Sequence, residues 1–154
     1  MTAYRIVRDD LSGSQVADLL RLHLDEMHQW SPACKVNALP LERLREPDVT
    51  FWSAWDGERL AAVGALKDLG DGRGELKSMR AAPEYRGRGA GEAILRHLLA
   101  EARARGYSWL GLETGVPEPF LPARRLYEKH GFAECPAFGD YVSDDFSLCM
   151  DRSL

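Results

Sequence analysis

A glycine-rich segment, Arg86–Gly91, has residue types and spacing suited to binding a pyrophosphate. It lies between an expected strand over residues 75–81 and an expected amphipathic helix over residues 92–105. Alternating glycines let the main chain approach a ligand and direct the free N–H groups of a helix start toward it. The helix dipole and two arginines add positive charge at the same place. The segment therefore predicts an anion cradle at a helix N-terminus.

Two other nucleotide-binding folds use glycine loops of this kind. A P-loop requires Lys followed by Ser or Thr after its glycines, and this segment has neither. A dinucleotide fingerprint would place Ile94 or Glu92 where its third glycine belongs. Glu113 lies at about the distance expected of a ribose-binding acid, but tight turns rather than helices join the upstream strands. A dinucleotide-dependent oxidoreductase therefore remains an alternative that fits the motif poorly.

The elements that must position this cradle follow from hydrophobic periodicity and turn residues. Strands are expected over residues 4–8, 49–55, 60–69, 75–81, 109–113, 132–135 and 146–150. Helices are expected over residues 16–30, 40–45, 92–105 and from 122 to about 130. The strands expected over residues 49–55, 60–69 and 75–81 form a meander before the first long crossover. The pattern therefore predicts one mixed α/β domain over residues 1–154 rather than regular β-α-β alternation.

Composition narrows the class of protein. The chain has 154 residues, 45% hydrophobic and 29% charged, and a net charge of −4, which argues against general nucleic-acid binding. It shows no apolar leader and no run of membrane-spanning length. Cys34, Cys135 and Cys149 lie far apart, as expected of reduced thiols. We therefore expect a soluble cytoplasmic protein without nucleic-acid or membrane partners.

Two motifs together point to a family. Arg86, Gly89 and Gly91 occupy the three fixed places of R/Q-x-x-G-x-G/A. A second run, Ala123-x-x-Leu126-Tyr127-Glu128-Lys129-x-Gly131-Phe132, is similar to A-x-x-L-Y-x-K-x-G-F. With a strand between them, the two motifs resemble those of the GNAT (Gcn5-related) N-acetyltransferase superfamily. The resemblance covers nearly the whole chain, although residues before Val49 match only in outline. It implies the GNAT acyltransferase fold, a mostly antiparallel sheet of about seven strands flanked by about four helices.

The resemblance also implies acetyl-CoA as co-substrate, no metal, and an amine acceptor attacked directly in a ternary complex. The main chain would bind the pyrophosphate at Arg86, Gly87, Arg88, Gly89, Ala90 and Gly91. The pantetheine arm would pair with the strand at Met79, Arg80 and Ala81 as an added strand, with an N–H near Met79 or Arg80 facing the oxyanion. Phe120 stands where the family often has an Asn that contacts the pantetheine arm.

Three residues are candidates for proton transfer. Tyr127, one helical turn after Ala123, would contact the cofactor and protonate the leaving sulfur. Glu75 is the first candidate base, because it matches a glutamate that serves as base, directly or through water, in some members of the family that the chain resembles. Glu75, Lys77, Met79 and Ala81 are expected to share one face of a strand. Glu113 is the second candidate, and an amine that is already neutral needs no dedicated base. A non-catalytic acyl-CoA-binding module would keep the cradle and lack these roles.

The sequence says less about the residues that bind the acceptor than about those that bind the cofactor. By the resemblance, residues 16–45 and the loop 140–145 shape the acceptor pocket. Lys77 and Arg80 would add positive charge there, which favours an acceptor that carries a carboxylate. The run from His23 to His28 has its histidines five apart, so we expect a solvated helix surface rather than a metal site. Implied partners are acetyl-CoA and the amine acceptor, and a homodimer is compatible with the sequence.

Overall fold

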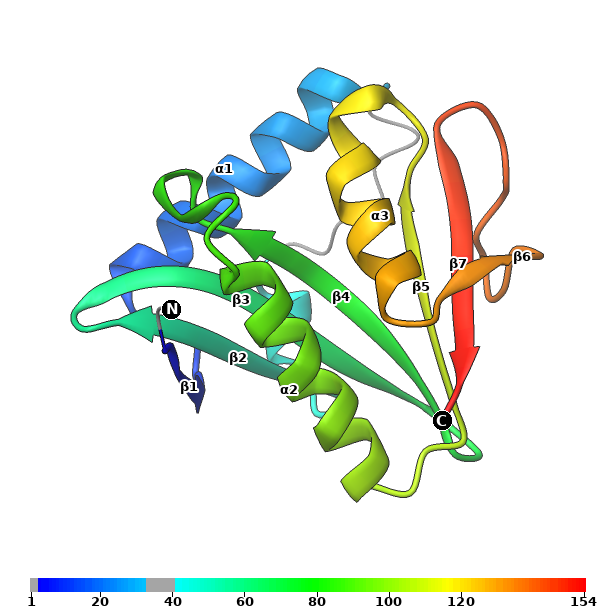
Figure 1. Ribbon diagram of the computed structural model, residues 1–154, viewed down its shortest axis with the longest axis horizontal. Helices are drawn as coiled ribbons and strands as arrows, with labels where there is room; N and C mark the ends of the chain where they lie inside the picture. The colour runs from blue at the N-terminus through cyan, green and yellow to red at the C-terminus, as the bar shows by residue number, and fades with distance from the viewer. Residues whose placement is uncertain (1–2, 33–40) are drawn as a thin grey trace.

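One seven-stranded sheet organises the molecule, with strand order β1-β2-β3-β4-β5-β7-β6 (Figure 1). The computed structural model describes residues 3–32 and 41–154, so Cys34 and the start of the expected helix 40–45 lie outside the described residues. Every neighbouring pair of strands is antiparallel except β4 and β5, which are parallel. The strands are β1 (Arg5–Arg8), β2 (Val49–Asp56), β3 (Arg59–Gly70), β4 (Arg73–Ala81), β5 (Trp109–Gly115), β6 (Ala133–Cys135) and β7 (Ser147–Ser153).

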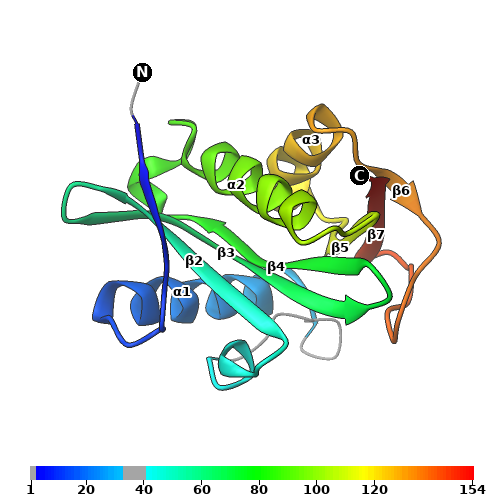
Figure 2. The same ribbon diagram turned by 90° about the horizontal axis from the view of Figure 1, so that it is seen from below.

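Three α-helices cover this sheet in the part of the chain that is described. They are α1 (Ser14–Trp30), α2 (Ala90–Ala104) and α3 (Leu121–Lys129). Figure 2 shows α1 on one face of the sheet and α2 and α3 on the other. The expected helix 40–45 is instead a short 3-10 turn, η2 (Arg43–Arg45), so about four helices was one too many for the described residues. Over residues 3–32 and 41–154 no helix has the length and apolarity needed to cross a membrane.

The core lies between β3 and α2, as the helix periodicity predicted. Ile94, Leu95 and Leu98 of α2 are fully buried, as are Val63 and Leu66 of β3. Each such side chain contributes roughly 1.5–3 kcal/mol on burial. This packing fixes the N-terminus of α2, and therefore the glycine segment before it, relative to β4.

The sheet opens between β4 and β5. Only three residue pairs join them, the last being Glu75 with Gly111. Beyond that pair β4 continues to Ala81 while still bonded to β3, and β5 continues to Gly115 while still bonded to β7 (Figure 1). The two strands diverge, and the edge of β4 after Glu75 is left without a partner strand among the described residues.

A bulge in β4 sits at this opening. The pairing shifts from Ala65 with Lys77 to Val63 with Arg80, and Ser78 between them has a left-handed φ of 52°. A left-handed non-glycine residue costs free energy and persists only where its surroundings impose it. The extra residue breaks the alternation of side chains along the strand.

The bulge overturns one expectation about side-chain direction. A Cβ atom on Gly64 would lie 2.8 Å from Sδ of Met79 and 3.0 Å from Leu98, so Met79 is on the α2 face. Arg80 ion-pairs with Glu26 of α1, on the opposite face. The prediction that Met79 shares a face with Glu75 and Lys77 is therefore wrong, because strict alternation ends at Ser78.

The close approach at Gly64 gives a test of this packing. Gly64→Ser would place Cβ against Met79, Leu98 and Ile94, so we expect the free energy of unfolding to fall by about 1–3 kcal/mol in urea denaturation. Gly13→Ser is the matched control, because Gly13 is the N-cap of α1 with no atom within 4 Å of an added Cβ. Serine is favoured at that position, so the control should be neutral or stabilising. Equal effects of the two changes would contradict the assigned packing.

Candidate functional site

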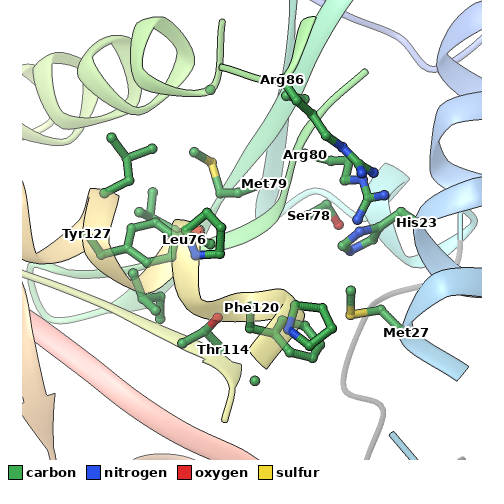
Figure 3. Close-up of a pocket in the computed structure, with 18 of the residues that line it drawn as sticks. His23, Met27, Leu76, Ser78, Met79, Arg80, Arg86, Thr114, Phe120 and Tyr127 are labelled. Carbon is green, nitrogen blue, oxygen red and sulfur yellow. The ribbon is translucent and has the colours of Figure 1, made fainter. Parts of the chain in front are cut away.

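A cavity of about 850 Å³ occupies the opening between β4 and β5 (Figure 3). Its walls come from α1, β4, the glycine segment, β5 and α3. Lys77, Met79, Arg80 and Ala81, which sequence analysis placed at the site, all line it. The divergence of the two strands thus brings the predicted residues of β4 to a single hollow.

The glycine segment forms one end of the cavity. Gly87 and Gly89 have φ of 72° and 80°, a region that side-chain-bearing residues rarely adopt. Gly89 is the N-cap of α2, and its carbonyl accepts the first helical hydrogen bond from the N–H of Ala93 at 2.9 Å. The N–H groups of the first turn are therefore available to a ligand. Together with Ala90 and Gly91 at the cavity wall, this is the geometry of an anion cradle.

The two arginines of the segment point in different directions. Nη2 of Arg86 lies 3.2 Å from a carboxylate oxygen of Glu26, and Arg86 lines the cavity. The Arg88 guanidinium lies over the ring of Tyr85 at 4.6 Å, and Arg88 is not among the residues that line the cavity. Arg88 therefore offers the cavity no side chain, and any part it has in an anion site falls to its main chain.

An ion cluster joins the first turn of α2 to the end of α3. Glu92 accepts from Lys129 Nζ at 2.7 Å and from His130 Nε2 at 2.8 Å. Hydrogen bonds from Lys129 and His130 lower the pKa of the Glu92 carboxyl from 4.5 to about 2. Lys129 also lines the cavity near the cradle. Sequence analysis quoted Lys129 only as part of a motif and missed this contact, because its partner lies on another helix.

Tyr127 of α3 is part of the cavity wall. Its side chain is 7% exposed, and its ring packs edge-on against Phe132 with centroids 5.9 Å apart. Burial, with a smaller contribution from the charge of Glu113, raises the pKa of the hydroxyl. The Tyr127 hydroxyl therefore stays protonated near neutral pH and has a proton to donate.

Glu113 and Glu75 occupy very different surroundings. Glu113 lines the cavity, and its Oε2 accepts a hydrogen bond from Ser147 at 2.6 Å. Glu75 is 4% exposed and is outside the set of residues that line the cavity. Of the two candidate bases, Glu113 is the one with access to a ligand in the cavity.

The Glu75 carboxylate is held by two partners. It accepts from the Tyr141 hydroxyl at 2.5 Å and from Lys77 Nζ at 3.3 Å. Burial and the charge of Glu75 raise the pKa of the Tyr141 hydroxyl. Tyr141 comes from the loop between β6 and β7, so this cluster fixes the loop expected to border the acceptor pocket. Lys77 faces the cavity with its charge largely matched by Glu75.

Residues of α1 form another part of the cavity wall, within the range 16–45 that the resemblance implied for the acceptor pocket, although sequence analysis singled out none of them for it. His23 is buried and lines the cavity with Met27 (Figure 3), as does Trp30. The expectation of a solvated helix surface is wrong for His23, which falls one turn after Leu19 on the apolar face. Burial and the charge of Arg80 lower the pKa of the His23 ring to about 4. The imidazole is therefore neutral at pH 7.

Phe120 closes this end of the cavity. Its ring packs edge-on against Trp30 of α1, with centroids 5.3 Å apart. It also covers Gly115 at the tip of β5, where an added Cβ would lie 2.2 Å from the ring. Phe120, at the position where the family that this chain resembles often has Asn, is therefore an apolar contact between α1 and β5.

Comparisons with known proteins agree with this architecture. Residues 9–132 match the model of the acetyltransferase (GNAT) family. An uncharacterised N-acetyltransferase of Bacillus subtilis, YsnE, is 47% identical over 95% of this chain and 97% of its own. One of Escherichia coli, YedL, is also 47% identical, over 98% and 95% of the two chains. An IAA acetyltransferase of Azospirillum brasilense is 37% identical over 91% and 89%.

Solved structures share the fold. An acyl-CoA N-acyltransferase structure from Klebsiella pneumoniae has a TM-score of 0.78 at 27% identity, covering 98% of this chain and 97% of that one. A Bacillus subtilis acetyltransferase in complex with CoA has a TM-score of 0.71 at 18% identity and covers 99% of each chain. The second likeness concerns the fold alone.

The Glu92 cluster predicts a pH dependence of stability. Because the native pKa of Glu92 is about 2 against an ordinary 4.5, its ion pairs stabilise the fold fully above pH 4.5 and lose their effect as the pH falls toward 2. Glu92→Gln should therefore lower the free energy of unfolding by about 1 kcal/mol at pH 7 and by nearly nothing near pH 2. Urea unfolding followed by circular dichroism across this pH range measures the difference.

The exposed Glu128 on α3 provides the matched control for this change. Glu128→Gln removes the same charge from the neighbouring helix and should stay within about 0.5 kcal/mol of the parent at every pH. A Glu92→Gln effect of equal size at pH 7 and pH 2.5 would show that the ion pairs are not its source.

Proposed function

The chain belongs to the GNAT family of acetyltransferases, and on that premise we propose that it transfers acetyl from acetyl-CoA to a primary amine. The acceptor is a small molecule or an exposed amino group, and it attacks the thioester directly in a ternary complex. The observation that carries the proposal is the single cavity between the diverging strands. An anion cradle lies at one end of it, and a protonated tyrosine and an accessible carboxylate lie on its walls.

The cavity supports one orientation of the cofactor. The pyrophosphate would bind the main-chain N–H groups from Arg86 to Gly91, with Lys129 at the same end. The pantetheine arm would run along the free edge of β4, from Leu76 to Ala81, and complete the hydrogen bonding of that strand. This path directs the thioester away from the cradle, toward Tyr127 and Glu113.

The chemistry then follows from the groups on the walls. The amine nitrogen attacks the thioester carbonyl, and the oxyanion that forms is stabilised by the N–H of Met79 or Arg80 beside the Ser78 bulge. The amine loses a proton to Glu113, directly or through water. When the intermediate collapses, the C–S bond breaks and the Tyr127 hydroxyl donates its proton to the sulfur. The products are the acetylated amine and CoA.

Glu113 is the base favoured by these contacts, and Glu75 is assigned a positioning role. The Glu75 carboxylate accepts hydrogen bonds from Lys77 and Tyr141, and Glu75 is outside the set of residues that line the cavity. The Tyr141 hydroxyl and the Lys77 ammonium both donate to its Oε2. Its contacts instead hold Lys77 and the β6–β7 loop in place.

The role of Tyr127 is tested by removing only its hydroxyl. Tyr127→Phe should lower kcat for thiol release by roughly 10²–10⁴-fold while leaving acetyl-CoA binding intact, because the ring packing against Phe132 is kept. Thiol release from acetyl-CoA with a panel of primary amines measures turnover, and the thermal shift caused by CoA measures binding. Tyr107→Phe, outside the cavity, is the control. An unchanged kcat would refute the assignment, and CoA binding without turnover in the parent would favour a non-catalytic acyl-CoA-binding module.

The two carboxylates are separated by a paired substitution. Glu113→Gln should lower kcat most at low pH, where the amine needs a base, with partial recovery as the pH approaches the pKa of the free amine. Glu75→Gln should instead lower stability, by about 1–3 kcal/mol, with a pH–rate profile of unchanged shape. Steady-state rates from pH 6 to 10 and urea unfolding distinguish the two. The reverse pattern would make Glu75 the base.

A further inference from the structure

The cavity end formed by α1 and the β4 bulge has the properties of an anion site. We propose that the acceptor carries a carboxylate in addition to its amine, and that Arg80, Ser78 and His23 bind this carboxylate. The inference rests on the proposed transfer to an amine and specifies the chemical class of the acceptor. The site adjoins the cofactor cradle, because Arg86 of the cradle and Arg80 share the carboxylate of Glu26.

Buried polar groups without partners are the first line of support. Nδ1 of His23, Oγ of Ser78 and Nε of Arg80 are all buried, and within the described part of the chain none has a hydrogen-bond partner. All three residues line the same end of the cavity, where Figure 3 shows their side chains close to one another. A buried polar group left unsatisfied costs about 1–3 kcal/mol. Three such groups on one wall indicate a ligand that supplies the missing acceptors.

The charges at this end are the second line of support. Arg80 and Arg86 share a single carboxylate, Glu26, whose Oε1 lies 2.6 Å from Nη2 of Arg80 and 3.2 Å from Nη2 of Arg86. Two cations facing one anion leave an excess positive charge. The Arg80 side chain is only 9% exposed, so water screens little of this excess. A ligand carboxylate would balance it.

Lys77 is a less suitable anchor than sequence analysis expected. Its ammonium is 3.3 Å from the Glu75 carboxylate and also donates to the Tyr141 hydroxyl at 2.5 Å. Its charge is therefore matched within the protein. His23 has a pKa lowered to about 4 and supplies a hydrogen bond rather than a charge at pH 7. Arg80 is consequently the cation that identifies the ligand as an anion.

The remaining walls define where the amine lies. Glu113 projects from β5, on the opposite side of the opening from Arg80 on β4, and suits an ammonium or an amine about to lose its proton. The apolar side chains of Met27, Trp30 and Phe120 line the same cavity. A molecule with an amine, a carboxylate and an apolar body, such as an amino acid, matches this arrangement.

Matched pairs of amines test the proposal by turnover. L-phenylalanine against L-phenylalaninamide, and β-alanine against β-alaninamide, differ in the negative charge and in the pKa of the amine, so kcat/KM is compared per concentration of neutral amine. We expect kcat/KM to be at least tenfold higher for the carboxylates, and Arg80→Gln to remove this preference by raising KM. The amides should respond to the substitution less than threefold. Equal kcat/KM within both pairs, or an equal effect of Arg80→Gln on both members, would overturn the proposal.

A binding measurement keeps the test independent of turnover. CoA-loaded protein is titrated calorimetrically with 3-phenylpropionate, which has the carboxylate but no amine, and with 3-phenylpropionamide. We expect only the carboxylate to bind, at least tenfold more weakly to Arg80→Gln, with Arg80→Lys intermediate and the exposed Arg103→Gln unchanged. Equal binding of carboxylate and amide, no binding of either, or binding indifferent to Arg80 would refute the site. Arg80-dependent binding in a protein that acetylates no amine would support the site and count against the proposed transfer.

Discussion

The early end of the β4–β5 ladder is the constraint on which the rest of this molecule depends. Each strand keeps its other neighbour, β3 or β7, along its length, so the sheet opens without unfolding. The opening leaves main-chain groups on β4 after Glu75 available to a ligand. It also separates the walls enough to form a cavity lined by residues of α1, β4, the glycine segment, β5 and α3. The Ser78 bulge at this point breaks the alternation of side chains, so that Met79 lies on the α2 face and Arg80 on the α1 face of the sheet.

Local sequence rules predicted the elements and the cradle well, because turn residues, glycines and helix periodicity act over short distances. The Asp56-Gly57 turn, the glycines before α2 and the apolar stripe of that helix all have the expected structure. The bulge at Ser78 was not predictable, since no local residue signal marks it. Contacts such as Tyr141 with Glu75, 66 residues apart, depend on tertiary packing that periodicity does not describe.

His23 shows where a sharper use of the same rules would have helped. The residue lies seven positions after Val16 and four after Leu19, both buried, which places it on the apolar face of α1. The five-residue spacing between His23 and His28 argues against a metal pair, but it does not show which face of the helix His23 occupies. A polar residue on an apolar stripe is either satisfied in the core or directed into a cavity. Here its Nδ1 has no partner among the described residues, which identifies the second case.

The two halves of the site differ in how sequence encodes them. The cofactor half is built from main-chain N–H groups and a strand edge, whose requirements are glycines, a helix start and a small set of spacings. The acceptor half is built from side chains of α1, β4 and β5 that meet only after folding. The charges there are set by ion pairs such as Glu26 with Arg80 and Glu75 with Lys77. What matters is which of these ion pairs leaves a cation unmatched. Family motifs therefore indicate the cofactor, whereas the acceptor that we propose rests on the balance of buried charges.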